Sequence, residues 1–165
     1  MQLRDANFQK LELLANYSRL LMDHVAIGAY GRVQTSFNQA LPQSEQIGIA
    51  SFQELSTFDA GTLGGDEGWV IRGEVSSPWN IAAAPIPVTV APYAFAATGA
   101  LYLQRPTVLE QGTTRVSSLG LGVRLLGTLN PGFSQASLTF EFGRRFRDDY
   151  LPDANRFTMV GSVRF

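Results

Sequence analysis

The sequence predicts an all-β protein, a transmembrane β-barrel of antiparallel strands that is apolar outside and polar inside. Three observations predict this class. Apolar and polar residues alternate with a period of two, the alternating stretches are long, and short links along the chain alternate with long ones. The chain has 165 residues, which is room for about eight strands at about 20 residues per strand and connection.

The alternation is clearest at the end of the chain, in residues 157–165. Four earlier stretches alternate in the same way and are expected to be strands: residues 10–18, 24–37, 118–125 and 135–142. Soluble strands most often have about five or six residues, whereas barrel strands need about 9–11 to cross a bilayer. The longer runs favour the membrane barrel.

The links and the aromatic residues favour the same class. Short links are expected at Asn38–Glu45 and Leu129–Gly132, and longer ones at residues 58–68, Arg105–Thr114 and Arg147–Arg156. Short turns on one side and long loops on the other are typical of outer-membrane barrels. Aromatic residues near the expected strand ends fit the lipid–water boundary, where such rings are enriched: Phe37, Trp79, Phe133, Phe146, Tyr150 and Phe157.

The composition leaves little room for catalysis or for nucleic-acid binding. Charged residues are 16% of the chain, below the average of about 25%, and the net charge of −1 does not suit the neutralisation of many phosphates. Without cysteine, and with His24 as the only histidine, no thiolate or histidine cluster for a metal exists. Asp148, Asp149 and Asp153 are interpreted as a solvated loop. We therefore predict no enzyme, no cofactor and no metal site.

No export signal or membrane helix is visible in the sequence. The first ten residues contain no apolar core of a signal peptide, and no apolar run is long enough to span a membrane as a helix. A signal peptide, if the protein has one, is expected outside this sequence.

One stretch, GGDEGWVIRGE at Gly64–Glu74, carries a family resemblance. Val70–Gly73 (V-I-R-G), after Gly64 and Gly65, resembles the V-R-G-Y/F loop motif of outer-membrane protein transporters. The surrounding sequence resembles the two-partner secretion transporters, the haemolysin secretion/activation proteins (ShlB/FhaC/HecB-like). The likeness continues in Pro92–Gly99, Ser118–Leu125 and the terminal strand.

The resemblance implies a function and a place in a larger barrel. Residues 1–165 would be strands nine to sixteen of a 16-stranded barrel, without the family's periplasmic transport-associated domains. The implied function is secretion, and activation, of a large haemolysin- or adhesin-type exoprotein across the outer membrane of a Gram-negative bacterium. The implied partners are that exoprotein, outer-membrane lipid, the barrel insertion machinery and the missing N-terminal half of the barrel, with no nucleic acid. The family's C-terminal insertion signal would be Phe157, Met159, Gly161, Val163 and Phe165.

In that family the motif loop lies between strands eleven and twelve and folds into the lumen, where its arginine pairs with acids on the inner wall. By resemblance, residues 58–76 would fold inward and place Arg72 against the wall. The inner-wall motif would be Phe95, Ala97 and Gly99, an apolar patch on which Trp69 and Ile71 could pack.

The sequence departs from the family at two positions. Ala97 stands where the family's F-x-D-x-G motif has its acid, and Glu74 stands where an aromatic residue follows R-G. A substitute partner for Arg72 is therefore expected, and the candidates are Glu54, Asp66, Glu74 and Glu141. We prefer Glu141, which alternation places on the inner face of a strand. By the same resemblance, Ala97→Asp would restore the missing acid and tighten the loop.

Two other interpretations remain open from the sequence. One is a self-contained eight-stranded outer-membrane barrel with a structural or adhesive role and a filled interior. The other is a soluble ligand-binding barrel, although its strands would carry more lysine and glutamate. For the half-barrel, we expect unpaired edges at about Phe8–Leu20 and Phe157–Phe165, which would make the isolated chain aggregate or pair with its missing half.

Overall fold

The computed structural model describes the chain except for residues 1–7, 82–86, 109, 131–133, 150–151 and 165. Among the described residues, a single antiparallel sheet contains eight strands. Seven follow one another in the order β1 (Leu11–Met22), β2 (Val25–Thr35), β5 (Glu67–Ser76), β7 (Val88–Tyr102), β8 (Thr113–Asn130), β9 (Ser134–Arg147) and β10 (Ala154–Arg164), and the short β6 (Trp79–Ile81) pairs with β7. The all-β class and the antiparallel sheet of about eight strands are confirmed.

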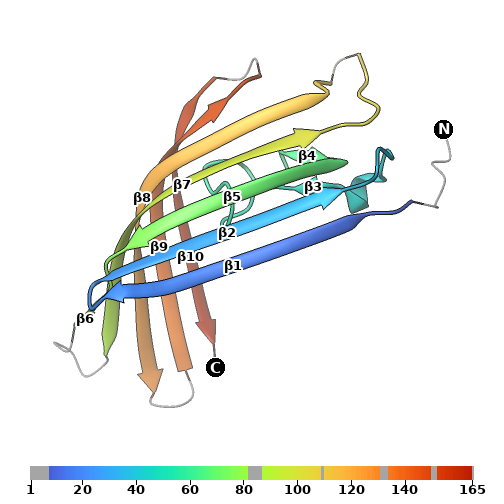
Figure 1. Cartoon of the computed structure of the whole chain (residues 1–165). Helices are drawn as coiled ribbons and strands as arrows, with labels where there is room; N and C mark the ends of the chain where they lie inside the picture. Colours follow the sequence, from blue (N-terminus) through green and yellow to red (C-terminus); the bar gives the residue numbers. More distant parts are fainter. Residues whose placement is uncertain (1–7, 82–86, 109, 131–133, 150–151, 165) are drawn as a thin grey trace.

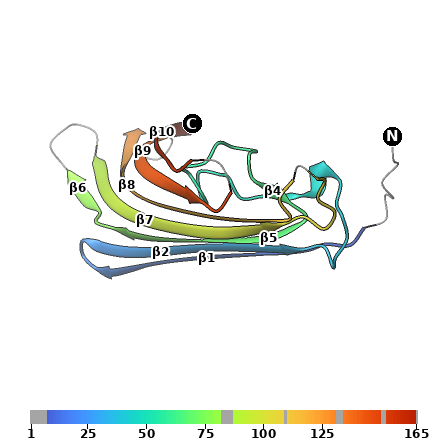
Figure 2. The same cartoon turned by 90° about the horizontal axis from the view of Figure 1, so that it is seen from above.

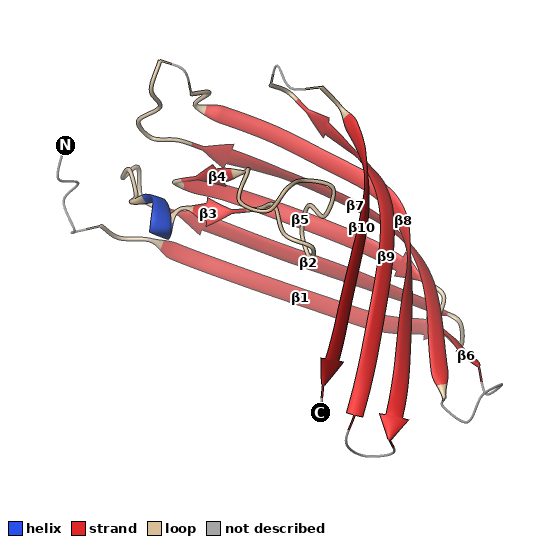
Figure 3. Ribbon diagram, turned by 180° about the vertical axis from the view of Figure 1, so that it is seen from behind, coloured by secondary structure: helices blue, strands red, loops and turns tan. Residues whose placement is uncertain are grey.

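The sheet is strongly curved and open, with β1 at one edge and β10 at the other (Figures 1 and 3). Each of these two strands pairs with a single described neighbour, β2 and β9 respectively. The shape is that of a section of barrel wall, with one concave and one convex face.

The two faces differ in the way the alternation predicts. On β8, Leu119 and Leu121 lie on the convex face and are exposed, whereas Val116 and Ser118 are buried on the concave face. On β10, Phe157, Met159 and Val163 are exposed on the convex face. An apolar outer face is stable in lipid, because apolar side chains lose no favourable interaction with water when they face the hydrocarbon core.

The connection between β2 and β5 is not the short link expected at Asn38–Glu45. Residues 36–66, here called the inward segment, lie within the curve of the sheet (Figure 2). The segment contains a 3-10 turn, η1 (Gln43–Glu45), and a small antiparallel sheet in which β3 (Ile47–Gly48) pairs with β4 (Gly64–Gly65). An inward fold therefore exists, but it ends before Glu67 instead of running from 58 to 76.

The motif V-I-R-G is a segment of the wall. β5 pairs with β2 along one side and with β7 along the other, so Val70–Gly73 cannot belong to a lumenal hairpin. A ten-residue strand with two hydrogen-bonded neighbours satisfies its backbone fully, which a free hairpin in the lumen would not. The prediction that the motif lies in the inward loop is thus wrong: the motif lies in β5, the strand that follows the inward segment.

A hydrophobic cluster holds the inward segment on the wall. The segment contributes Ile47, Ile49, Ala50, Leu55, Phe58 and Leu63, and the wall contributes Val70, Ala97, Leu101 and Val116. Burial of a large aliphatic or aromatic side chain contributes about 1.5–3 kcal/mol. The segment is therefore a packed element of the fold and not a loose loop.

The connections at the two ends of the sheet differ in length, although the one from β5 to β7, which includes β6, is long and lies at the same end as the turn from β1 to β2. The inward segment and the links after β7 and β9 leave from one end, and β1 joins β2 by a tight turn at the other (Figure 1). At this short-turn end the ring of His24 stacks on Trp79 with centroids 3.9 Å apart. No helix among the described residues has the length and apolarity needed to cross a membrane.

Candidate functional site

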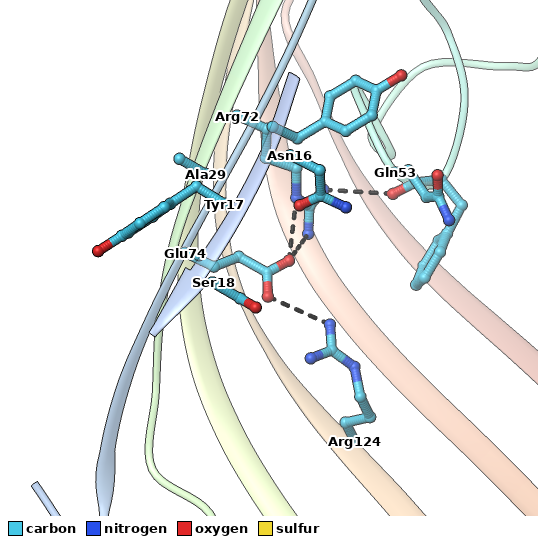
Figure 4. Close-up of a pocket in the computed structure, with 11 residues that line it drawn as sticks. Asn16, Tyr17, Ser18, Ala29, Gln53, Arg72, Glu74 and Arg124 are labelled. Atoms are coloured by element: carbon cyan, nitrogen blue, oxygen red, sulfur yellow. Dashed lines mark hydrogen bonds and ion pairs between the residues drawn. The ribbon is translucent and has the colours of Figure 1, made fainter. Parts of the chain in front are cut away.

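Arg72 lies at the centre of the concave face and is 4% exposed. Alternation along β5 turns Val70 and Arg72 inward, and turns Ile71 and Val75 to the exposed convex face. A guanidinium at a buried position is costly unless charged and polar partners surround it. The surroundings of Arg72 supply such partners, of which Figure 4 shows Glu74.

Two carboxylates of the wall pair with Arg72. Its Nη2 lies 2.5 Å from Oε1 of Glu141 on β9, and 3.0 Å from Oε2 of Glu74 on β5 itself. Arg72 Nε also donates to Glu74 Oε2, at 3.2 Å. Glu141 is 2% exposed, so the pair with Arg72 is shielded from water.

The inward segment supplies the remaining partners. Arg72 Nη1 donates to Ser56 Oγ at 3.1 Å and to the carbonyl oxygens of Phe52 and Glu54 at 3.4 Å each. Backbone carbonyls in a turn have no strand partner, and a guanidinium with five donors can satisfy several of them together. Arg72 thus connects the wall to residues 52–56 of the segment.

Aromatic rings lie beneath the charges. The Arg72 guanidinium stacks over the ring of Phe95 at 4.1 Å, and Tyr93 O–H donates to Glu141 Oε1 at 2.6 Å. Both rings lie against glycines of the next strand: a Cβ on Gly122 would lie 2.4 Å from the Tyr93 ring, and one on Gly120 would lie 2.8 Å from Phe95. The glycines of β8 therefore give these rings the space they occupy.

A second arginine completes a neutral network. Arg124 on β8 pairs with Glu74 through Nη2 and Oε1, 3.2 Å apart, and stacks over Tyr93 at 4.6 Å. Arg72 and Arg124 carry two positive charges and Glu74 and Glu141 two negative ones. Beside this network a pocket of about 290 Å³ opens toward Asn16, Ser18 and Gln53 (Figure 4).

The arrangement is suited to holding the segment. Its groups are charge-paired, and the network contains no histidine or cysteine to act as base or nucleophile. Among the described residues, no cluster of three or more potential ligands could hold a metal ion. Asp148, Asp149 and Asp153 lie instead against Arg115 N, the Arg147 side chain and Arg144 respectively.

The structure brings several of the expected site residues together. Of the four candidate acids, Glu141 and Glu74 lie against Arg72, and Glu54 offers its backbone carbonyl. Asp66 lies elsewhere, where its carboxylate accepts from Leu41 N, Gln46 Nε2 and Gln104 N. Phe95, Ala97 and Gly99 are buried on the concave face; Gly64 and Gly65 form β4.

The expected packing of Trp69 and Ile71 on the inner-wall motif is wrong. Odd-numbered residues of β5 face outward, and Ile71 is exposed on the convex face. The apolar partner of that patch is the inward segment: a Cβ on Gly99 would meet Ile49 Cδ1 at 3.0 Å. The patch does receive an apolar cover, but from Ile49, which precedes the expected inward loop of residues 58–76.

Sequence reasoning did not single out Arg32, Tyr93 or Arg124, although alternation placed Arg32 and Arg124 on the polar face. The alternation pattern could have indicated Arg32 and Arg124, because an arginine on an inward strand position requires an acid nearby. The last residue of the expected insertion signal, Phe165, lies outside the described residues.

The model of one protein family, Haemolysin secretion/activation protein ShlB/FhaC/HecB, matches residues 2–125 of the chain. The match contains β1 to β7 and most of β8, and it includes Arg72, the inward segment and the inner-wall motif. β9, with Glu141, and β10 lie beyond it. Searches of curated proteins and of solved structures gave no match.

Proposed function

The chain belongs to the haemolysin secretion/activation protein family of outer-membrane two-partner secretion transporters, and from this membership we propose that it contributes to the pore that exports one large exoprotein. The exoprotein would be of the haemolysin or adhesin type, and its secretion would be coupled to its activation. Members of this family are transporters and not enzymes, which agrees with a buried site made of paired charges.

The observation that carries the proposal is the inward segment itself. Residues 36–66 cover a region of the concave face through a hydrophobic cluster and through Arg72. A side-chain-filled small barrel has no need of such a segment. A pore that opens for a polypeptide needs an element that occupies the lumen at rest, and this segment has the position for that role.

We further propose that residues 1–165 are the second half of a larger barrel. β1 and β10 each have one unpaired side among the described strands, and unpaired backbone groups in lipid cost several kcal/mol each. Strands from the other half of the barrel would pair with both edges. The barrel insertion machinery would read the β10 residues Phe157, Met159, Gly161 and Val163, together with Phe165.

The test is exoprotein release per inserted barrel, in a complete transporter that carries this chain. Arg72→Ala removes the connection between wall and segment, and we expect release to fall by about tenfold or more while insertion stays near the parent level. Arg144→Ala is the matched control, because Arg144 is exposed near the long-loop end of β9. If Arg72→Ala releases as much exoprotein as Arg144→Ala, Arg72 has no role in secretion; if the parent releases none, the transporter proposal fails.

A further inference from the structure

The inward segment carries a buried acid that the Arg72 network does not use. The carboxylate of Glu54 is 2% exposed and faces Arg32 on β2. Arg32 Nη2 donates to Glu54 Oε2 at 3.1 Å, and Arg32 Nε lies 2.7 Å from Oε1 without the alignment of a hydrogen bond. Ser51 Oγ donates to the same carboxylate at 2.7 Å and Tyr30 O–H at 3.3 Å.

Arg32 makes contact with the segment at a second point and with the neighbouring strand. Its Nη2 also donates to the carbonyl of Gly48, in β3, and its Nη1 lies 3.4 Å from Glu12 Oε1 on β1. Arg32 is about one-fifth exposed, so it still reaches water, whereas Glu54 does not. Loss of Arg32 would therefore leave a buried negative charge without its cation.

Both wall arginines converge on one residue of the segment. Arg32 binds the side chain of Glu54, and Arg72 binds its backbone carbonyl. In this chain the segment supplies the acid and the wall supplies the arginines. This is the reverse of the arrangement expected from the resemblance, in which an arginine of the lumenal loop pairs with an acid on the wall. We propose that Glu54 and Arg32 are the positioning pair that fixes the inward segment in the lumen, an inference that rests on the proposed transport function for its role.

The side of the segment that faces β9 and β10 is attached differently. Asp59 is 66% exposed and pairs with Arg156 at 2.8 Å and with Arg145 at 3.7 Å, on β10 and β9. Exposed pairs of this kind are screened by solvent and salt, whereas a buried pair is not. The segment thus has a firm attachment at Glu54 and a weak one at Asp59, and displacement of the segment requires the Glu54–Arg32 pair to open.

A cysteine reporter can measure that displacement, because residues 1–165 contain no cysteine, and the transporter without Thr57→Cys gives the background rate of labelling. Thr57 is 2% exposed and its hydroxyl makes no hydrogen bond among the described residues, so Thr57→Cys removes little. In the inserted transporter, without exoprotein, a membrane-impermeant maleimide reaches this position only when the segment lifts from the wall. The measured quantity is the rate of labelling in the Thr57→Cys background.

The experiment compares Arg32→Met, Glu54→Gln and the two together. Arg32→Met leaves the Glu54 charge buried and unpaired, so we expect labelling about tenfold faster or more. Glu54→Gln keeps the shape and removes the charge, so its effect should be smaller, and the double variant should label within about threefold of Glu54→Gln alone. Suppression of one substitution by the other shows that Arg32 acts through Glu54.

The matched control is Asp59→Asn, which removes an exposed pair on the same segment and should change labelling by less than about twofold. If Arg32→Met fails to insert, Arg32→Lys replaces it, with labelling expected about threefold faster because an ammonium is a point charge and lacks the guanidinium's planar fork. The proposal is overturned if labelling stays at the parent rate, or if the double variant labels as fast as the arginine variant alone. Since no exoprotein is used, this result stands apart from any failure of secretion.

Discussion

Replacement of Arg72 by methionine should be among the most destabilising single changes on the concave face. Methionine keeps much of the aliphatic volume over Phe95 but removes the guanidinium that Glu141 and Glu74 share. Glu74 keeps a partner, because Arg124 lies 3.2 Å away. Among the described residues, Glu141 keeps only the hydrogen bond from the Tyr93 hydroxyl. The main cost therefore falls on one buried carboxylate.

The size of the stability loss follows from this difference between Glu74, which keeps a cation, and Glu141, which does not. Breaking a buried ion pair by removing one partner costs about 3–5 kcal/mol, mostly because a charge stays buried without compensation. In Arg72→Met/Glu141→Gln no such charge remains at Glu141, and the expected loss is about 1–2 kcal/mol, the scale of the lost hydrogen bonds to the inward segment. The double variant should thus be more stable than Arg72→Met by about 1–4 kcal/mol.

The assay is the free energy of unfolding, from urea titration of the complete transporter folded in detergent or lipid, with the four proteins of the double-mutant cycle measured under one condition. Glu74→Gln serves as a comparison, because Glu74 is partly exposed and should matter less. If the losses of Arg72→Met and Glu141→Gln simply add, the two residues are not coupled, and the buried-pair argument is refuted.

Three further changes test the packing of the inward segment. Gly143→Ala should lower the free energy of unfolding by about 1–3 kcal/mol, since its Cβ would lie 2.7 Å from Thr57 Cγ2, whereas Gly127→Ala has open space and should be neutral in the same titration. Leu55→Ala should cost about 2–5 kcal/mol, because Leu55 is fully buried in the cluster, and an unchanged midpoint would contradict that packing. Ala97→Asp should loosen the segment, contrary to the expectation from the family motif, because Ala97 lies in the hydrophobic cluster. Faster maleimide labelling of Thr57→Cys would confirm the loosening, and slower labelling would support the expectation that the restored acid tightens the segment.

The sequence by itself determined the class of the fold and the direction of most side chains. Alternation with a period of two places Leu121 outside and Glu141 inside without any knowledge of the neighbouring strands. The same rule was the reason to prefer Glu141 among the acids, because an inward residue of another strand can reach an arginine on the concave side. The family was also recognisable, and the match to residues 2–125 confirms it.

Only the tertiary structure decided which segment folds into the lumen. A strand in the wall and a hairpin in the lumen can share the letters V-I-R-G, and what separates them is whether two neighbouring strands offer hydrogen bonds in register, as β2 and β7 do for β5. Residues 36–66 lack a regular period, so their burial depends on contacts with Val70, Ala97, Leu101 and Val116, which are distant in sequence. The pairing of Glu54 with Arg32 arises from the same cause: the segment must first fold back before its acid can reach β2.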